Sequence, residues 1–334
     1  MRIAVLSPVA WRTPPEHYGP WEQVASNLTE NLVKMGADVT LFATADSLTT
    51  AHLDAVIDQG YETLKGQDAK VLECLHIGHL MENAHRFDII HNHFDFLPLT
   101  YSKLIKTPII TTIHGFSSSQ IIPVYQKYNR NTHYVSISDA DRSPELEYMA
   151  TVYNGISPED FEFNDQPEDY LLYFGRIHHD KGTAEAIDIA LKSDKKLIIA
   201  GIVQDPDYFR ERIEPFLDDQ IEFIGHAGPQ KRKKLMKNAL ALLHPINFDE
   251  PFGLSVAEAM FCGTPTIAFK RGSMPELILH EKTGYLVENV EEAAAIIRKG
   301  LAVDRENCHA TASLRFSAER MAADYFNLYQ QILK

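Results

Sequence analysis

Short apolar runs alternate with helical patterns along the chain. Residues 2–6 form an apolar run, residues 21–35 carry apolar side chains at helical spacing, and residues 38–42 form the next apolar run. Apolar runs of this length are typical of buried parallel strands. The strand–helix–strand order therefore predicts an α/β fold of the doubly wound kind. Further strands are expected at residues 87–90, 108–113, 134–138, 170–174, 196–200, 221–224, 239–243, 266–269 and 283–287.

A polar segment divides this pattern in two. Five of the six residues 164–169 are Asn, Asp, Gln or Glu, and the sixth is Pro167, a composition typical of a linker. A chain of 334 residues is long enough for two domains. We therefore predict an N-terminal domain at residues 1–163, a second domain at residues 164–316 and a final helix at residues 317–334.

Composition narrows the function classes. The net charge of −14 disfavours nucleic acid as the main partner, because phosphate backbones need a basic surface. The three cysteines are scattered without a Cys-x-x-Cys pair, so neither a disulfide framework nor a zinc site is indicated. The N-terminal apolar run is too short for a signal peptide, and no stretch has the length of a transmembrane helix. We expect a cytoplasmic enzyme.

Two glutamates frame the start of a helix predicted in the second half. Glu250 precedes Pro251, which sits where a helix takes its first residue, and Glu258 follows eight positions after Glu250. A rise of about 1.5 Å per residue separates the two carboxylates by about 12 Å, roughly the reach from a sugar across a pyrophosphate to a ribose. The N–H groups between them, a natural phosphate site at a helix start, belong to Phe252, Gly253 and Leu254. This pattern indicates a nucleotide-sugar clamp.

The same residues carry a resemblance to a known family. Residues 250–265, EPFGLSVAEAMFCGTP, resemble the paired-glutamate motif of the retaining family-4 glycosyltransferases, which have the GT-B fold. The resemblance spans nearly the whole chain. It implies two Rossmann-like domains facing across a cleft, with the acceptor side in the first domain, the donor in the second, and a last helix that crosses back to the first.

The resemblance also implies an activity. It suggests a hexosyltransferase that moves a hexose from a nucleotide-diphosphate sugar, with UDP-glucose preferred, to an acceptor hydroxyl with retention. Glu250 would hold the sugar hydroxyls and Glu258 the ribose hydroxyls. His114, at the end of a predicted strand in TTIHG, would contact the sugar near the reacting carbon, and Ile224 and His226 would flank the base.

Two loops complete the expected site. Arg176 and Lys181 lie in a strand-to-helix loop that matches the family's Gly-Arg…Lys-Gly motif, and two cations ahead of a helix suit a pyrophosphate. The family's first loop has two glycines, whereas this chain has Gly19 followed by Pro20, so only Gly19 carries over. Whether this loop binds phosphate or shapes the acceptor side stays open.

Several alternatives remain at this point. No cofactor and no metal are expected, because the two cations already balance the phosphates; Asp205 and Asp207 are assigned to a turn. The basic run 231–237 is expected to be a solvated helix face, with contact to acidic lipid or an anionic acceptor left open. The acceptor can be a sugar, a lipid or a small molecule. A sugar-nucleotide epimerase, a phosphorylase or a non-catalytic nucleotide-sugar binding protein would share the fold. A dehydrogenase is disfavoured, because no Gly-x-Gly-x-x-Gly follows a strand.

Overall fold

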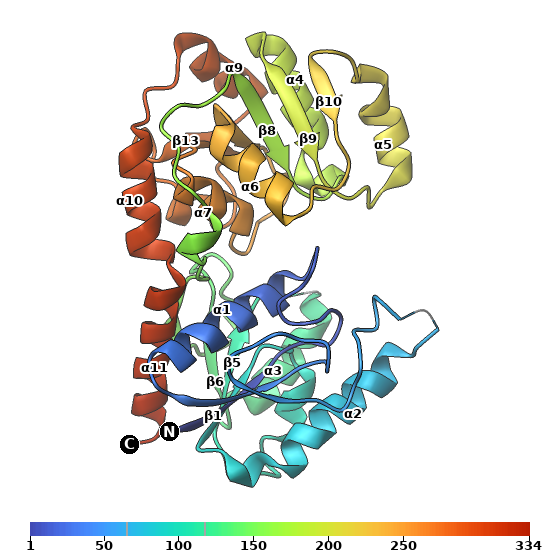
Figure 1. The fold of residues 1–334 in the computed structure, drawn as a ribbon, viewed down its shortest axis with the longest axis vertical. Helices are drawn as coiled ribbons and strands as arrows, with labels where there is room; N and C mark the ends of the chain where they lie inside the picture. Colours follow the sequence, from blue (N-terminus) through green and yellow to red (C-terminus); the bar gives the residue numbers. More distant parts are fainter. Residues whose placement is uncertain (65, 117) are drawn as a thin grey trace. The chain divides into compact units, whose positions relative to one another are not determined.

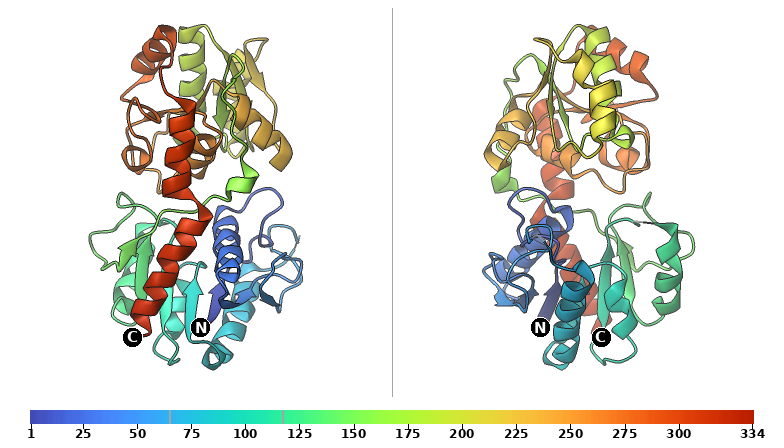
Figure 2. Two further views of the ribbon diagram at one scale, coloured as in Figure 1. Left: turned by 60° about the vertical axis from the view of Figure 1, so that its left-hand side comes forward. Right: turned by 90° about the vertical axis from the view of Figure 1, so that its right-hand side faces the viewer.

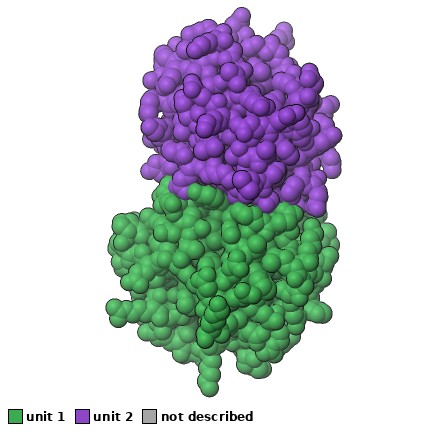
Figure 3. All heavy atoms as spheres, turned by 90° about the vertical axis from the view of Figure 1, so that its left-hand side faces the viewer, with its two compact units in different colours: residues 1–155, 318–334 green, residues 156–317 purple. Residues whose placement is uncertain are grey.

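The computed structural model describes residues 1–64, 66–116 and 118–334 (Figures 1 and 2). Its contacts divide the chain into two compact units (Figure 3). Unit 1 comprises Met1–Gly155 and Ala318–Lys334, and unit 2 comprises Ile156–Ser317. The chain therefore leaves unit 1 at Gly155, ahead of the polar segment at 164–169, which belongs to unit 2.

Unit 1 is built on a seven-stranded parallel sheet. Its strand order is β3-β2-β1-β4-β5-β6-β7. The strands are β1 (Arg2–Leu6), β2 (Asp38–Phe42), β3 (His52–Asp54), β4 (Ile89–Asn92), β5 (Ile109–Ile113), β6 (His133–Ser136) and β7 (Ala150–Thr151). The α-helices are α1 (Pro20–Lys34), α2 (Ala69–Glu82), α3 (Ile122–Tyr128) and α11 (Ala318–Ile332). Helix α2 packs against β1 and β4, and α3 packs against β5 and β6.

The last helix belongs to unit 1. Helix α11 lies beside α1 (Figure 2), and its inward positions Met321, Tyr325 and Leu328 are all buried. Its tyrosine hydroxyls reach polar side chains of the central strands: the Tyr325 hydroxyl is 2.6 Å from Thr112 Oγ1, and the Tyr329 hydroxyl is 2.6 Å from His91 Nδ1. Buried polar groups are stabilised when they are paired in this way, so these contacts bind the final segment to the sheet.

Unit 2 repeats the architecture with six parallel strands. Its strand order is β10-β9-β8-β11-β12-β13. The strands are β8 (Tyr170–Phe174), β9 (Lys196–Ala200), β10 (Ile221–Phe223), β11 (Ala241–His244), β12 (Thr266–Phe269) and β13 (Gly284–Val287). The α-helices are α4 (Thr183–Ser193), α5 (Pro206–Arg212), α6 (Pro229–Asn238), α7 (Leu254–Phe261), α8 (Met274–Leu277), α9 (Val290–Lys299) and α10 (Arg305–Phe316). The predicted pair of doubly wound α/β units is confirmed.

Each sheet has a point where the strand order reverses. In unit 1 this switch point lies between β1 and β4, and in unit 2 it lies between β8 and β11. Ligands of open parallel sheets bind outside the carboxyl ends of the strands at such points. The loops that follow these four strands are therefore the places to look for chemistry.

Four helices depart from the predictions. Helix α7 begins at Leu254 rather than at Pro251, because Gly253 adopts a left-handed conformation with φ of 90° and cannot sit inside a helix. Helices α3 and α5 were not predicted, and neither was α10. Its buried residues Cys308, Ala312 and Phe316 recur every four positions, but two of them are small, and the apolar stripe is correspondingly weak.

Candidate functional site

A buried ion pair marks the switch point of unit 2. Lys181, in the loop after β8, places Nζ 2.6 Å from Oε2 of Glu250, in the loop after β11, and both side chains are about 15% exposed or less. His244 Nε2 lies 3.7 Å from the same oxygen, and the Phe248 ring centroid is 4.4 Å from Lys181 Nζ. Burial alone would raise the pKa of Glu250, but His244 and Lys181 outweigh it and hold that pKa at about 2. Glu250 is therefore ionised at neutral pH.

Two glycines hold the loop that carries Glu250. Gly182 has φ of 71°, and a Cβ on it would lie 1.8 Å from the carbonyl oxygen of Pro245. Gly272 packs against Glu250 itself, where a Cβ would lie 2.4 Å from the Glu250 nitrogen. Asn247 adds a backbone hydrogen bond of 2.7 Å to the Asp180 carbonyl. Only residues without a side chain permit these approaches, so the position of Glu250 is fixed from both sides.

The predicted phosphate-binding cations share one loop but have different surroundings. Tyr173 donates its hydroxyl hydrogen bond to the Arg176 carbonyl at 2.9 Å and approaches the Lys181 carbonyl at 3.3 Å, which holds the two ends of the loop together. The Arg176 guanidinium is partly exposed and donates to Gln204 Oε1 at 2.5 Å. Lys181 is thus the buried cation of the pair with Glu250, whereas Arg176 faces solvent with a neutral partner.

Glu258 lies on α7 and is 4% exposed. Its Oε1 forms an ion pair with Arg232 of α6, and its Oε2 is buried without a hydrogen-bond partner among the described residues. Arg232 also lies 5.3 Å from the ring centroid of Phe174, at the end of β8. A buried carboxylate oxygen with spare acceptor capacity suits a ligand hydroxyl.

This contact corrects one prediction. Residues 231–237 were expected to form a solvated basic face, but Arg232 points inward to Glu258, Lys233 pairs with Asp160 at 2.7 Å, and Lys237 pairs with Glu162 at 2.6 Å. The sequence did contain a signal for this. Arg232 lies four residues before the apolar Met236 and therefore on the same face of the helix, and Met236 is fully buried. Sequence reasoning also gave no role to His244, although it ends β11 six residues before Glu250.

The start of α7 contains the three predicted N–H donors. Phe252 is buried, its ring meets Phe316 edge-on, and its carbonyl accepts a hydrogen bond of 2.7 Å from the Ser273 hydroxyl. Gly253 is the residue before the helix, and Leu254 is its first residue. The positive end of α7 therefore lies between Glu250 and Glu258, as the sequence spacing suggested.

The predicted base-flanking residues lie at the edge strand of unit 2. Ile224 is half-buried and donates its N–H to the Ile199 carbonyl at 3.0 Å, and His226 is exposed. The Gly201 N–H donates to the Gly225 carbonyl at 3.0 Å, so the glycines that end β9 and β10 are neighbours. The structure groups Ile224 and His226 with the strand ends of β9 and β10, and it groups Glu250 with β8 and β11.

His114 and Gly19 belong to unit 1. His114 follows β5 and stacks on Trp21, with ring centroids 5.5 Å apart, and its Nε2 is 3.0 Å from His93 Nδ1. Burial lowers the pKa of His114 to about 3, so the imidazole is neutral and one of these two nitrogens donates to the other. Gly19 immediately precedes α1 with φ of 153°, and its carbonyl accepts from the Gln23 N–H at 2.9 Å.

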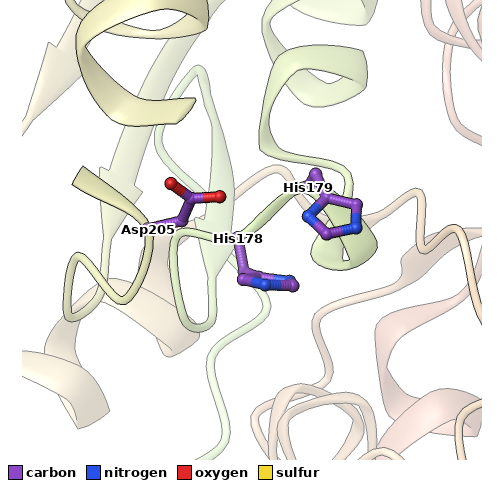
Figure 4. A group of neighbouring side chains, drawn as sticks. All are labelled: His178, His179 and Asp205. Atoms are coloured by element: carbon purple, nitrogen blue, oxygen red, sulfur yellow. The ribbon is translucent and has the colours of Figure 1, made fainter. Parts of the chain in front are cut away.

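Figure 4 shows a group that could hold a cation. His178, His179 and Asp205 each offer one ligand atom, and these atoms lie within 4.8 Å of one another. Each also has a local role: Asp205 caps α5 by accepting the Tyr208 N–H at 3.0 Å, His178 Nδ1 accepts the Asp180 N–H at 3.3 Å, and His179 Nε2 is 2.8 Å from Asp180. Of the two aspartates predicted to lie in a turn, Asp205 is therefore a helix cap and Asp207 lies inside α5.

Known proteins resemble both halves of the chain. The family model described as Glycosyltransferase Family 4 matches residues 21–159, and the model described as Glycosyl transferases group 1 matches residues 157–312. The glycogen synthase of Mycobacterium tuberculosis is 23% identical, over 97% of this chain and 91% of the relative.

Solved structures resemble it along its full length. The sucrose-phosphate synthase of Thermosynechococcus elongatus has a TM-score of 0.79 at 18% identity, with 99% of each chain covered. HepE of Anabaena, solved in complex with UDP and glucose, has a TM-score of 0.75 at 20% identity, again with 99% of each chain covered. None of the described helices of the present chain combines the length and hydropathy needed to cross a membrane.

Proposed function

Because this chain belongs to the family-4 glycosyltransferases and has the GT-B fold, we propose that it moves a hexose from a nucleoside-diphosphate sugar to an acceptor hydroxyl with retention at the anomeric carbon. The observation that carries the proposal is the buried Lys181–Glu250 pair at the switch point of unit 2. It provides a cation and an ionised carboxylate within one site, the two groups that a diphosphate and a sugar require.

The donor would be held along the line from Glu250 to Glu258. Glu250 accepts hydrogen bonds from the sugar hydroxyls, and the free Oε2 of Glu258 accepts from the ribose hydroxyls. Between them, the N-terminus of α7 at Phe252, Gly253 and Leu254 faces the diphosphate. Ile224 and His226 would flank the base at the end of β10.

The reaction requires stabilisation of a leaving group. The bond between the anomeric carbon and the diphosphate oxygen breaks, the bond to the acceptor oxygen forms on the same face, and the acceptor proton passes to the departing phosphate. Lys181, Arg176 and the α7 N-terminus stabilise the negative charge that develops on that phosphate. Neutral His114 donates or accepts a hydrogen bond near the reacting carbon, and Gly19 lets the chain approach without a side chain.

UDP-glucose is our preferred donor. A relative of the same fold was solved with UDP and glucose, and relatives named glycogen synthase and sucrose-phosphate synthase fit a glucosyl donor. We propose further that no metal takes part, because two cationic side chains and a helix N-terminus already supply positive charge to the diphosphate.

A screen of UDP, GDP, ADP and their hexose conjugates tests the donor. A true donor binds the native state and raises its melting temperature by mass action. The responding sugar nucleotide is then incubated with an acceptor panel, and the anomeric configuration of the product is read by NMR. An inverted product would contradict the retaining mechanism.

The carboxylate variant tests the clamp. Glu250→Gln should reduce kcat/KM at least about 100-fold, because the sugar loses a charged acceptor. Glu211→Gln, at an exposed position of α5, is the matched control and should keep wild-type turnover. Wild-type turnover in Glu250→Gln would reject this assignment.

The same assay separates the alternatives. An epimerase would change the sugar while it stays attached to the nucleotide, with no acceptor present. A phosphorylase would need inorganic phosphate and would release a sugar phosphate. A binding protein would give a melting-temperature response without donor consumption across the acceptor panel.

A further inference from the structure

Unit 1 has a pocket at its own switch point. The pocket has a volume of about 460 Å³, within the range typical of small-molecule sites. It is bordered by the segment after β1, the start of α1 and the segment after β4. Six of its fourteen lining residues are aromatic: Trp11, Tyr18, Trp21, Tyr61, Phe94 and Phe96.

The charged residues that line this pocket are all acidic. Glu22, Glu73 and Asp95 contribute carboxyl groups, and none of the described lining residues is a lysine, arginine or histidine. Burial raises the pKa of Glu22 to about 7 and that of Asp95 to about 6, and it raises the pKa of Glu73 as well. These groups are desolvated and lack a cationic partner within the lining.

The acidic groups are held in place by the fold. Asp95 has φ of 110°, an unfavourable backbone conformation for a residue with a side chain. Its carbonyl accepts from Asn92 Nδ2 at 2.8 Å, and its carboxylate accepts from the Tyr125 hydroxyl. Glu22 accepts from the Trp11 N–H at 3.3 Å. Strain retained in a pocket wall is typical of a functional position.

We propose that this pocket binds an uncharged saccharide ring, stacked on aromatic faces and hydrogen-bonded through its hydroxyls to the carboxylates, and that this ring is the acceptor class of the enzyme. The inference rests on the proposed function. The C–H groups on a pyranose face carry partial positive charge, which suits the negative face of an aromatic ring. Sugar hydroxyls are donors, and a carboxylate is the strongest acceptor that a side chain offers.

The charge of the pocket excludes other acceptors. A uronic acid or a phosphorylated acceptor would bring a further negative charge beside three desolvated carboxyl groups, and like charges at short range disfavour binding. A tetraalkylammonium ion would also suit aromatic and acidic walls, but it carries no hydroxyl to accept a glycosyl group. Because glycosyl transfer needs a hydroxyl on the acceptor, a neutral sugar is the favoured occupant of this pocket.

The pocket contains its own reporter. The chain has two tryptophans, Trp11 and Trp21, and both line the pocket. Intrinsic fluorescence can therefore follow occupancy without turnover and without donor. We would titrate the full chain at pH 8 with methyl glucoside, galactoside and mannoside, with their uronate counterparts, and with tetramethylammonium. At least one neutral glycoside should bind at least 10-fold more tightly than its uronate.

A matched pair of variants tests the role of charge. Glu73 and Glu82 both lie on α2, but Glu73 lines the pocket and Glu82 is exposed. Glu73→Gln should weaken neutral-sugar binding several-fold and reduce the discrimination against the uronate, whereas Glu82→Gln should leave both unchanged. Retention of full discrimination in Glu73→Gln would overturn the charge argument.

Three results would reject the proposal. These are tighter binding of the uronates, a response to tetramethylammonium alone, and no fluorescence response to any glycoside up to tens of millimolar. The melting-temperature response to sugar nucleotides is measured on the same protein. If that response persists while the glycosides fail, the acceptor class is wrong and the donor function stands; if both fail, the proposed function falls as well.

Discussion

Among single residues, Glu250 illustrates how a buried charge is kept ready for a ligand. Its carboxylate is paired with Lys181 at 2.6 Å, so neither charge is left unpaired before the donor arrives. The incoming diphosphate can pair with Lys181 in place of Glu250, and the sugar hydroxyls can donate hydrogen bonds to Glu250 in place of Lys181. Such a pair is costly to break from one side, typically by about 3–5 kcal/mol, because the remaining charge stays buried.

The Glu250 carboxylate predicts acid sensitivity of unit 2. Its folded pKa of about 2 lies below the ordinary value of 4.5. A depressed carboxyl pKa contributes stability that is present above about pH 4.5 and is lost as the pH falls toward 2. The difference corresponds to about 3 kcal/mol. Urea unfolding followed by circular dichroism between pH 6 and 3 should show the wild type losing about 2 kcal/mol of this contribution.

Two variants separate this effect from general acid denaturation. Glu250→Gln cannot titrate at this position, so its unfolding free energy should fall less over the same pH window. Glu211→Gln should keep the wild-type dependence. Parallel pH profiles for wild type and Glu250→Gln would contradict the pairing of Glu250 with Lys181.

The proposal that no metal takes part predicts resistance to chelation. Dialysis against EDTA should leave turnover within about twofold of the untreated enzyme, because no step depends on a metal. The test is sensitive, since a metal that stabilised the transition state by only about 1.4 kcal/mol would already show as a tenfold loss. Turnover is measured before and after addition of Zn²⁺ and Mn²⁺. A loss that these ions restore in the wild type, but not in a His178→Ala/His179→Ala variant, would assign a metal to the group in Figure 4.

At the scale of elements, the sequence predicted positions along the chain better than the faces of helices. Pro251 indicated a helix start between Glu250 and Glu258, and the helix does begin between them, although at Leu254. The inward direction of Arg232 was missed because basic residues surround it at 231, 233 and 234. Its partner Glu258 is distant in sequence, and only the folded arrangement of α6 and α7 brings the two together.

Helix α6 therefore has an inward face at Arg232 and a solvent face at Lys234. Arg232→Met should raise the dissociation constant of the sugar nucleotide at least about 10-fold, because Glu258 loses the partner that orients it and is left buried without a counter-charge. Lys234→Met removes the same charge from an exposed position two residues away and should change the constant less than about twofold. Calorimetric titration with the donor measures both. Equal effects would show that only net charge matters.

The loop after β8 depends on a glycine for space. Gly182 and Gly225 have nearly the same φ, 71° and 68°, but a Cβ on Gly182 would lie 1.8 Å from the Pro245 carbonyl oxygen, and one on Gly225 meets nothing within 4 Å. Gly225→Ala should therefore cost about 1–2 kcal/mol for its left-handed backbone alone. Gly182→Ala should cost more, because the clash is added. Urea unfolding compares them, and equal losses would argue against close packing at Pro245.

At the scale of the whole molecule, two sheets with the same winding each place polar groups at a switch point. The alternating pattern predicted the strands β1, β2, β8, β9 and β12 at their observed bounds, because buried parallel strands are continuous apolar runs. The pocket of unit 1 was not predicted. Its walls come from segments near residues 11, 22, 73 and 95, which only the strand order brings together.

Within unit 1, Glu22 should contribute a loss of stability as the pH rises. Burial raises its folded pKa from 4.5 to about 7. A carboxyl whose pKa is raised contributes stability that is fully present below about pH 4.5 and is lost as the pH rises through 7, by about 3 kcal/mol. Because both tryptophans lie in unit 1, tryptophan fluorescence during urea unfolding at pH 5 and pH 8 follows this unit.

Replacement of Glu22 should remove that cost. Between pH 5 and pH 8, Glu22→Gln should gain stability relative to the wild type and exceed it at pH 8, whereas Glu82→Gln should behave as the wild type. A variant that is more stable but binds methyl glycosides more weakly would show that the buried carboxyl is kept for the ligand at the expense of stability. A Glu22→Gln variant that loses stability at both pH values would instead make Glu22 a structural residue, with its hydrogen bond from Trp11 as the stabilising contact.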